Sequence, residues 1–449
     1  MSCGASSALN TNNARRRLCP QDEIQKKTYS TSGGIIMADL TREDFLKLDR
    51  KDQLAPFREE FYIPEGVIYM DGNSLGVMPK AASKRVREVT DREWGHDLIK
   101  SWNMADWFNA PRRIGDKIAK IIGAEEGEIV ATDSTGINLF KAISATLAIN
   151  SDRSVIVMEG SNFPTDNYIA QGLIEFLGRQ HQIRFVEKDS IMEAIEDNVA
   201  VVSLTDVHYK TGHLLDMKVI TAKAHQHGAL TVWDLCHSAG AIPIDLNGAN
   251  ADFAVGCGYK YLNGGPGAPA FIFVAKRHHD KLKQPLTGWW SHRSPFDFTR
   301  DYEIGEGINR MLCGTQPVIS LSALEVGVDI MTRADIHKIR EKSKKMGDLF
   351  IASVEQKCGD YGFGIASPRN ADERGSQVSL THENSYAIMQ ALIERGVIGD
   401  FRAPEITRFG FTPLYLRYVD VWDAVDILSD VMANEIWKVP KYHIRMAVT

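Results

Sequence analysis

Short apolar runs alternate with amphipathic segments along most of the chain. Most runs are about 4–8 residues long, a length typical of buried strands rather than helices. They predict strands at 68–70, 154–158, 199–204, 230–233 and 271–274. Between them, apolar positions recur at helical spacing and predict helices over 110–122, 137–148, 167–178 and 218–227. This alternation predicts an α/β fold with a mainly parallel sheet covered by helices on both faces.

The pattern changes towards both ends of the chain. Residues 319–357 predict a long helical region, and 361–449 mix short strands and helices. Residues 1–36 are rich in Ser, Asn, Thr and Arg, and they have almost no apolar periodicity. Two interpretations of 1–36 stay open. One is a disordered extension or sequence upstream of a start at Met37, and the other is an organelle transit peptide, a kind of segment that is Arg- and Ser-rich and poor in acids.

Charge and cysteine content narrow the class of protein. The 449 residues include 52 basic and 58 acidic ones, for a net charge of -6 without a long run of one sign, so no nucleic-acid partner is expected. No apolar run reaches the roughly 20 residues that span a bilayer, so we expect a soluble chain without a membrane partner. The cysteines form no Cys-x-x-Cys pair and no His cluster has metal-ligand spacing, so we expect no metal site and free thiols of a reducing compartment. These cysteines are Cys3, Cys19, Cys236, Cys257, Cys313 and Cys358.

A carboxylate follows the apolar run at 230–233. Asp234 stands where that predicted strand ends. In an open α/β sheet, ligands bind at the carboxyl ends of the strands. There, a carboxylate is placed to hold a cationic ring nitrogen such as that of a pyridinium. The alternative is that Asp234 is the N-cap of a following helix, a position for which Asp is favoured.

A lysine follows a second run of apolar and small residues, 254–258. Lys260 precedes the turn-forming stretch 263–267, whose glycines allow backbone to approach closely. Desolvation lowers a lysine pKa and makes the amine a nucleophile towards carbonyls. The stretch from Asp234 to Lys260 has room for one crossover and one strand, so both side chains can reach one sheet edge. An amine for C4′ and a carboxylate for the ring nitrogen are what pyridoxal 5′-phosphate (PLP) needs.

A phosphate site and a ring-stacking face are also predicted. Residues 132–138 follow the short apolar run 129–131 and open an amphipathic helix, and hydroxyls and N–H groups at a helix N-terminus bind phosphate. The alternative is a simple capping sequence. Phe163 follows a predicted strand and is placed to stack on a pyridine ring; the alternative is a position in the core.

Several segments together resemble the kynureninase family, whose members are PLP enzymes of the aspartate-aminotransferase fold group. The resemblance runs from about Thr41 to about Ile427 and is closest to bacterial forms. It rests on Tyr69–Gly76, Phe163–Asp166, Trp233–Gly240, Gly258–Gly267, Gly288–His292 and Arg408–Tyr415. It implies fold type I, with a mainly parallel seven-stranded sheet in a large PLP-binding domain and a smaller α+β C-terminal domain. The corresponding boundaries are 37–65 for an N-terminal arm, 66–318 for the large domain and 319–449 for the small one.

The resemblance implies a role for each matching residue. Lys260 is the Schiff-base lysine, Asp234 is the partner of the pyridine nitrogen, and Tyr259 relays protons. Arg408 clamps the substrate α-carboxylate, and Asn73 lies in a loop that helps close over it. The implied cofactor-binding residues are Thr135, Gly136, Phe163, Asp166, Thr205, Asp234, His237, Tyr259, Lys260, Trp289 and Thr315. Gly136 departs from family members with a hydroxyl residue there, which leaves one phosphate contact to a backbone N–H.

The implied activity is hydrolytic cleavage of L-kynurenine to anthranilate and L-alanine in tryptophan catabolism, with 3-hydroxykynurenine as an alternative substrate that gives 3-hydroxyanthranilate. The resemblance also implies a cytoplasmic homodimer with shared active sites. Trp102, His292 and Thr315 are candidates to line the ring pocket. A cysteine desulfurase or aminotransferase is a second hypothesis, although desulfurases of this group typically carry His rather than Tyr before the lysine. A nucleotide-binding oxidoreductase or a binding module is a third, but neither a Gly-x-Gly-x-x-Gly turn nor a Walker motif is present.

Overall fold

The computed structural model describes residues 40–178 and 180–446. By contacts, the chain divides into Met1–Leu40 and Thr41–Thr449, and the description below concerns the second unit. The extension predicted at 1–36 lies outside the described residues, and so do Cys3 and Cys19.

A seven-stranded sheet dominates the first part of this unit. Its strand order is β2-β8-β7-β6-β5-β3-β4, and β8 alone runs antiparallel to its neighbours. The strands are β2 (Ile129–Ala131), β3 (Val155–Glu159), β4 (Gln182–Val186), β5 (Val199–Thr205), β6 (Leu230–Asp234), β7 (Phe253–Gly256) and β8 (Phe271–Val274). The mainly parallel seven-stranded sheet implied by the sequence is thus confirmed.

The strands form where apolar residues run without interruption. Every residue of β3, β5, β7 and β8 is buried, as expected for strands covered on both faces. The predicted strands are confirmed to within one residue at each end. The predicted strand at 68–70 lies outside the seven-stranded sheet. It forms β1 (Ile68–Tyr69), which pairs in parallel with β11 (Val397–Ile398) of the C-terminal part.

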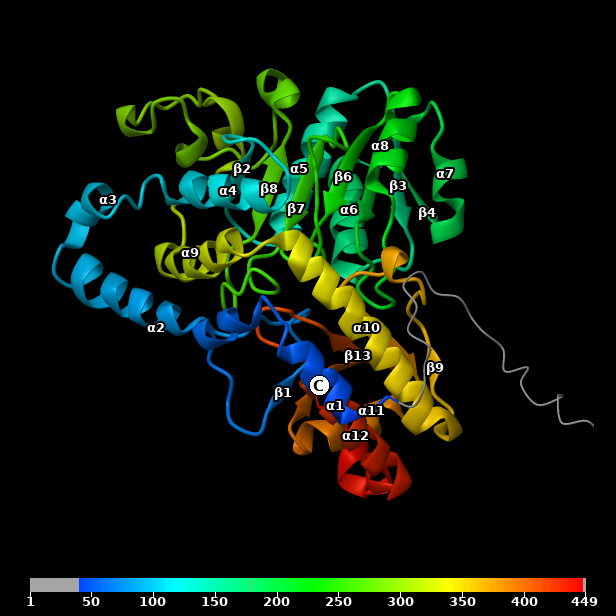
Figure 1. Cartoon of the computed structure of the whole chain (residues 1–449). Helices are drawn as coiled ribbons and strands as arrows, with labels where there is room; N and C mark the ends of the chain where they lie inside the picture. The colour runs from blue at the N-terminus through cyan, green and yellow to red at the C-terminus, as the bar shows by residue number, and fades with distance from the viewer. Residues whose placement is uncertain (1–39, 179, 447–449) are drawn as a thin grey trace, which may run out of the picture. The chain divides into compact units, whose positions relative to one another are not determined.

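Helices connect and cover these strands (Figure 1). The predicted helices are confirmed as α4 (Ala110–Ile121), α5 (Thr135–Ile149), α6 (Pro164–Phe176) and α8 (Met217–Gln226), and a short α7 spans Ile191–Ala194. Leu139 and Ile143 of α5 pack with Met158, Val232 and Ile272 of the sheet in one apolar core. Each such side chain, fully buried, stabilises the fold by about 1.5–3 kcal/mol. Within the described ranges, no helix is both long and apolar enough to cross a membrane.

The region 319–357 is not one helix, as its pattern allowed, but two. α9 (Val318–Arg333) ends before Ala334, whose backbone is extended, and α10 (Ile336–Cys358) begins after Asp335. The Asp335 carboxylate accepts a hydrogen bond from the His337 N–H, at 2.9 Å. An Asp N-cap of this kind is the local reason for a new helix start.

A second sheet lies in the C-terminal part. It has four antiparallel strands in the order β12-β13-β10-β9. They are β9 (Gly364–Ile365), β10 (Gln377–Thr381), β12 (Asp400–Arg402) and β13 (Ile406–Gly410). The helices around it are α10, α11 (Ser385–Glu394) and α12 (Tyr418–Ala433), and α1 (Arg42–Asp49) packs on α12. The remaining helices are α2 (Lys80–Arg87), which continues as a π-helix over Glu88–Trp94, and α3 (Ser101–Met104).

A buried lysine ties three distant segments together. The Nζ of Lys342, on α10, donates hydrogen bonds to Asp52 Oδ2 at 2.7 Å, Pro413 O at 2.6 Å and Leu416 O at 2.7 Å. The Lys342 side chain is only 5% exposed. Removal of one partner from a buried ion pair leaves the other unpaired, which costs about 3–5 kcal/mol.

We therefore expect Lys342→Met to lower the free energy of unfolding by about 3–5 kcal/mol, because it keeps the apolar stem and leaves Asp52 Oδ2 and two carbonyls without the lysine donor. Lys344→Met, two residues along the same helix, removes a more exposed pair with Asp372 and should cost no more than about 1 kcal/mol. Urea unfolding of both variants measures the difference. Equal losses would contradict an anchoring role for Lys342.

Candidate active site

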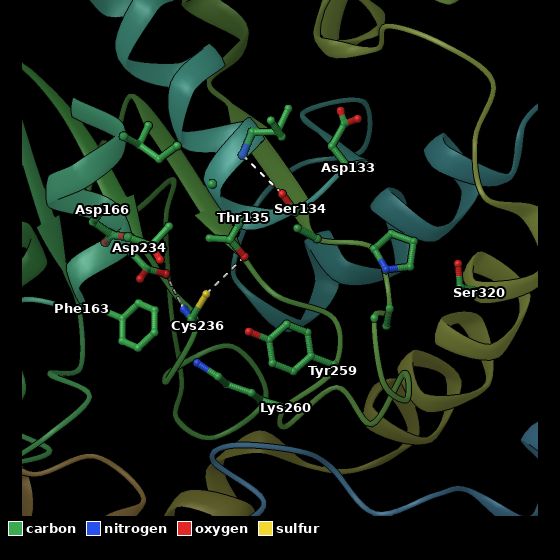
Figure 2. A pocket seen from close by; sticks show the side chains of 18 of the residues that line it. Asp133, Ser134, Thr135, Phe163, Asp166, Asp234, Cys236, Tyr259, Lys260 and Ser320 are labelled. Atoms are coloured by element: carbon green, nitrogen blue, oxygen red, sulfur yellow. Dashed lines mark hydrogen bonds between the residues drawn. The ribbon is translucent and has the colours of Figure 1, made fainter. Parts of the chain in front are cut away.

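A cavity of about 740 Å³ lies at the carboxyl ends of the parallel strands. Thr205 is the last residue of β5. Asp234 is the last residue of β6, and Lys260 follows β7 (Figure 2). This is the edge at which open α/β sheets bind ligands. All the predicted cofactor-binding residues except Trp289 line the cavity: Thr135, Gly136, Phe163, Asp166, Thr205, Asp234, His237, Tyr259, Lys260 and Thr315.

The Lys260 amine is held by a buried histidine. Its Nζ lies 3.0 Å from His237 Nε2. Burial lowers the pKa of His237 well below its ordinary value, and the charge of Lys260 lowers it further. The imidazole is therefore neutral at ordinary pH, and its Nε2 accepts the hydrogen bond from the lysine.

The segment 69–76 packs against the backbone of Tyr259 and Lys260. The Gly76 N–H donates to Tyr259 O at 2.7 Å. A Cβ at position 76 would lie 2.2 Å from Lys260 O, which no side chain allows. Glycine at 76 is therefore required by this close approach, which links β1 and its following turn to the lysine.

Two carboxyl groups lie together at the end of β6. The Asp234 carboxylate accepts a hydrogen bond from the Cys236 N–H at 2.8 Å, and a turn rather than a helix follows, so the N-cap alternative is wrong. Asp166 lies beside it and accepts from Asn162 Nδ2 at 2.8 Å. Burial, and next the charge of Asp234, raise the pKa of Asp166 well above its usual range. This shift favours the protonated form of Asp166.

The N-terminus of α5 forms another wall of the cavity. The Ser134 Oγ caps the helix by accepting from the Ile137 N–H at 3.5 Å, and Thr135 Oγ1 lies 3.6 Å from Cys236 Sγ (Figure 2). The first N–H groups of a helix have no partner within it. Thr135 and Gly136 therefore present backbone donors at the positive end of the helix, as an anionic group requires.

An exposed aromatic ring faces the same space. The Phe163 side chain is 45% exposed, so the core alternative is wrong. Its ring meets Tyr209 edge-on, with centroids 5.3 Å apart. Tyr209 and Cys236 both line the cavity, although no role is predicted for either from the sequence. The position of Tyr209 shortly after β5 was a usable signal, since it lies near a strand end.

The two predicted substrate-binding residues do not line this cavity. Arg408 is buried beside it, and one of its guanidinium N–H groups donates to the Tyr209 carbonyl. Asn73 is buried as well, with its Nδ2 3.4 Å from Gln377 Oε1.

Trp289 is the other predicted residue outside the cavity. It lines a separate cavity of about 370 Å³ that also includes His292. Trp102 packs against Trp107 and Trp290. Of the ring-pocket candidates, only Thr315 lines the cavity of Lys260.

The cavity fits PLP by the chemistry of its donors. Asp234 is buried and makes no ion pair within the part of the chain that the structure describes, so a cationic ring nitrogen would supply the missing partner. Lys260 supplies an amine, Phe163 an open ring face, and the α5 N-terminus a set of anion donors.

Solved structures with the same fold include cysteine desulfurases and a protein with a PLP cofactor. A cysteine desulfurase from Thermococcus onnurineus NA1 matches with a TM-score of 0.72 at 20% identity, over 84% of this chain and 98% of that one. A C-DES mutant with glycine covalently linked to its PLP cofactor matches with a TM-score of 0.72 at 15% identity, over 83% and 99%. Such identities show the fold alone.

Sequence relatives are more specific. Kynureninase from Burkholderia pseudomallei (strain 1106a) is 53% identical over 414 residues, which cover 91% of this chain and 100% of that protein. Kynureninase from Pseudomonas fluorescens is 50% identical with the same coverage. Residues 339–428 match the family model of the kynureninase C-terminal domain.

The fold and the cavity thus define a PLP-dependent enzyme of fold type I. Given the identity to curated kynureninases over their full length, the chain belongs to the kynureninase family. The resemblance predicted from its motifs, including the closeness to bacterial forms, is confirmed.

Proposed function

We propose that the chain hydrolyses the Cβ–Cγ bond of L-kynurenine, forming anthranilate and L-alanine, and that 3-hydroxykynurenine is an alternative substrate. The observation that carries the proposal is the convergence of Lys260 and Asp234 on one cavity in a chain half identical to kynureninases. When bound, PLP supplies an electron sink for the bonds around the substrate α-carbon.

Each residue of the chain has a defined task in this proposal. Lys260 would hold the cofactor through its amine, and its free Nζ would remove the α-proton of the substrate. Asp234 would keep the pyridine nitrogen protonated, and neutral His237 accepts a hydrogen bond from Lys260. Burial raises the pKa of Tyr259, and the neighbouring Cys257 raises it further, so its phenol keeps a proton to donate.

The activity test is anthranilate fluorescence with purified protein, L-kynurenine and added PLP. We expect turnover by wild type and a loss of at least about 10³-fold in Lys260→Ala, because neither the covalent attachment nor the proton transfer has a substitute. Lys188→Ala removes an exposed lysine and should match wild type. Turnover by Lys260→Ala at the wild-type rate would overturn the proposal.

Asp234→Asn and Arg408→Ala should fail in different ways. Asp234→Asn weakens the electron sink mainly in the transition state, so kcat should fall severely while the protein stays yellow. Arg408→Ala removes charge-assisted hydrogen bonds to the α-carboxylate, worth roughly 1.5–3 kcal/mol, so KM should rise at least about tenfold. Steady-state kinetics separate the two. Unchanged KM in Arg408→Ala would direct the test to Arg402 and then Arg417.

The proposed assembly is a cytoplasmic homodimer with shared active sites. The cytoplasmic assignment is supported by four free thiols, at Cys236, Cys257, Cys313 and Cys358. The dimer is supported by two exposed apolar stretches. One includes Trp94, Leu98, Ile99 and Met104, and the other includes Trp289, Phe296 and Phe298. Aromatic ring contacts connect them: Trp102 meets Trp290 at a tilt, and Trp290 meets Trp289 edge to face. Aromatic residues and Met are enriched at protein interfaces.

The position of Trp289 outside the cavity of its own chain supports a role in the partner's site. We therefore expect mixing of Lys260→Ala and Trp289→Ala subunits to restore activity. In a mixed dimer, one site then combines an intact Lys260 with an intact Trp289, so an equimolar mixture should reach about a quarter of the wild-type rate. A mixture no more active than the average of the two parents, or a fully active monomer by light scattering, would contradict sharing.

A further inference from the structure

Arg408 is fixed by acceptors on three sides. Its Nε donates to Asp400 Oδ1 at 2.9 Å, and Nη2 donates to Asp400 Oδ2 and, at 2.8 Å, to Ser74 Oγ. Its Nη1 donates to the carbonyl of Tyr209 at the cavity wall. The guanidinium is thus held rigidly, with one edge on Asp400 and the other towards the cavity.

A second guanidinium shares the same carboxylate. Arg402 Nη2 lies 2.6 Å from Asp400 Oδ2, and the Arg402 side chain is 30% exposed, whereas that of Arg408 is 1% exposed. Burial by itself would raise the pKa of Asp400, but Arg408 and then Arg402 hold it below its ordinary value. Asp400 is therefore ionised between two cations. Both arginines act on the cavity, because their charges add to the burial that lowers the pKa of His237.

A second carboxyl group, Asp71, lies against Asp400. Its Oδ1 is buried without a hydrogen-bond partner. Burial, and next the charge of Asp400, raise the pKa of Asp71 to about 8, although Arg408 and Ser74 act in the opposite direction. The other titratable groups that face Asp71 are Arg402, Tyr69, Tyr261 and Tyr415. Burial raises the pKa of all three tyrosines, so they stay neutral where Asp71 titrates.

We propose that Asp71 and Asp400 are a proton-sharing carboxyl pair that sets the charge of the substrate-carboxylate site. With Asp71 protonated, two guanidinium groups face one carboxylate, and one positive charge is left to receive the α-carboxylate. With Asp71 ionised, the two carboxylates balance the two guanidinium groups. The net charge is then zero, and the attraction for the substrate α-carboxylate is lost. Both aspartates are positioning residues that act through Arg408 and Arg402. The inference rests on the proposed function, because it takes the substrate to be an α-amino acid carboxylate.

The test uses holoenzyme and 4-(2-aminophenyl)-4-oxobutanoate, the substrate without its α-amino group, so that no substrate amine titrates. Calorimetry should give a Kd that is nearly constant below pH 8 and rises about tenfold per pH unit well above it, as one ionisation at a pKa of about 8 requires. In Asp71→Asn the rise should be absent between pH 7 and 9.5. The corresponding amide, which has no carboxylate, should bind without this pH dependence.

Asp400→Asn is the second variant. It leaves two guanidinium groups facing Asp71 alone, so one positive charge remains even when Asp71 is ionised, and Kd should stay nearly constant between pH 7 and 9.5. Asp372→Asn, an exposed carboxylate paired with Lys344, should follow wild type. A flat profile in wild type, or an unchanged rise in Asp71→Asn, would overturn the inference. Cleavage of kynurenine is scored separately, so a flat profile in a protein that cleaves it rejects this inference and leaves the proposed function standing.

Discussion

The site depends on the register of three parallel strands. Thr205 of β5 pairs with Asp234 of β6, and Asp234 pairs with Val255 of β7. Side chains alternate between the faces of a sheet, so a slip of one residue would turn Asp234 to the opposite face. Burial of β5 and β7 at every position prevents such a slip, because any shift would disturb two packed faces at once.

Carboxyl pairs occur twice in this part of the molecule. The protonated form is favoured at Asp166 beside Asp234 near the cofactor end, and at Asp71 beside Asp400 near the arginines. Two ionised carboxylates in contact are costly when buried, which favours a proton on one member of each pair. In the second pair the negative charge stays on Asp400, which is bonded to arginine.

The sequence was sufficient for the sheet, for the lysine and for most of the cavity wall. The end of a strand can be recognised from the local sequence. Thr205 and Asp234 end β5 and β6, and the N-terminus of α5 follows β2. The surroundings of Arg408 could not be predicted, because Ser74 and Tyr209 reach it from distant segments of the chain, and Asp400 reaches it only through the pairing of β12 with β13. Trp289 is a different case, because the sequence of one chain does not show whether a side chain contributes to its own active site or to that of a partner subunit. The domain boundaries at 65 and 318 stay predictions.

The bonds of Arg408 also have a consequence for the order in which the enzyme is completed during synthesis. Arg408 lies 334 residues after Ser74 and 199 after Tyr209, both of which it contacts. Chains emerge from the ribosome N-terminus first. The strands of the large sheet, Lys260 and α5 are therefore all synthesised before Arg402 and Arg408. A nascent chain can form the walls of the Lys260 cavity before the two guanidinium groups that lie beside Asp400 have been made.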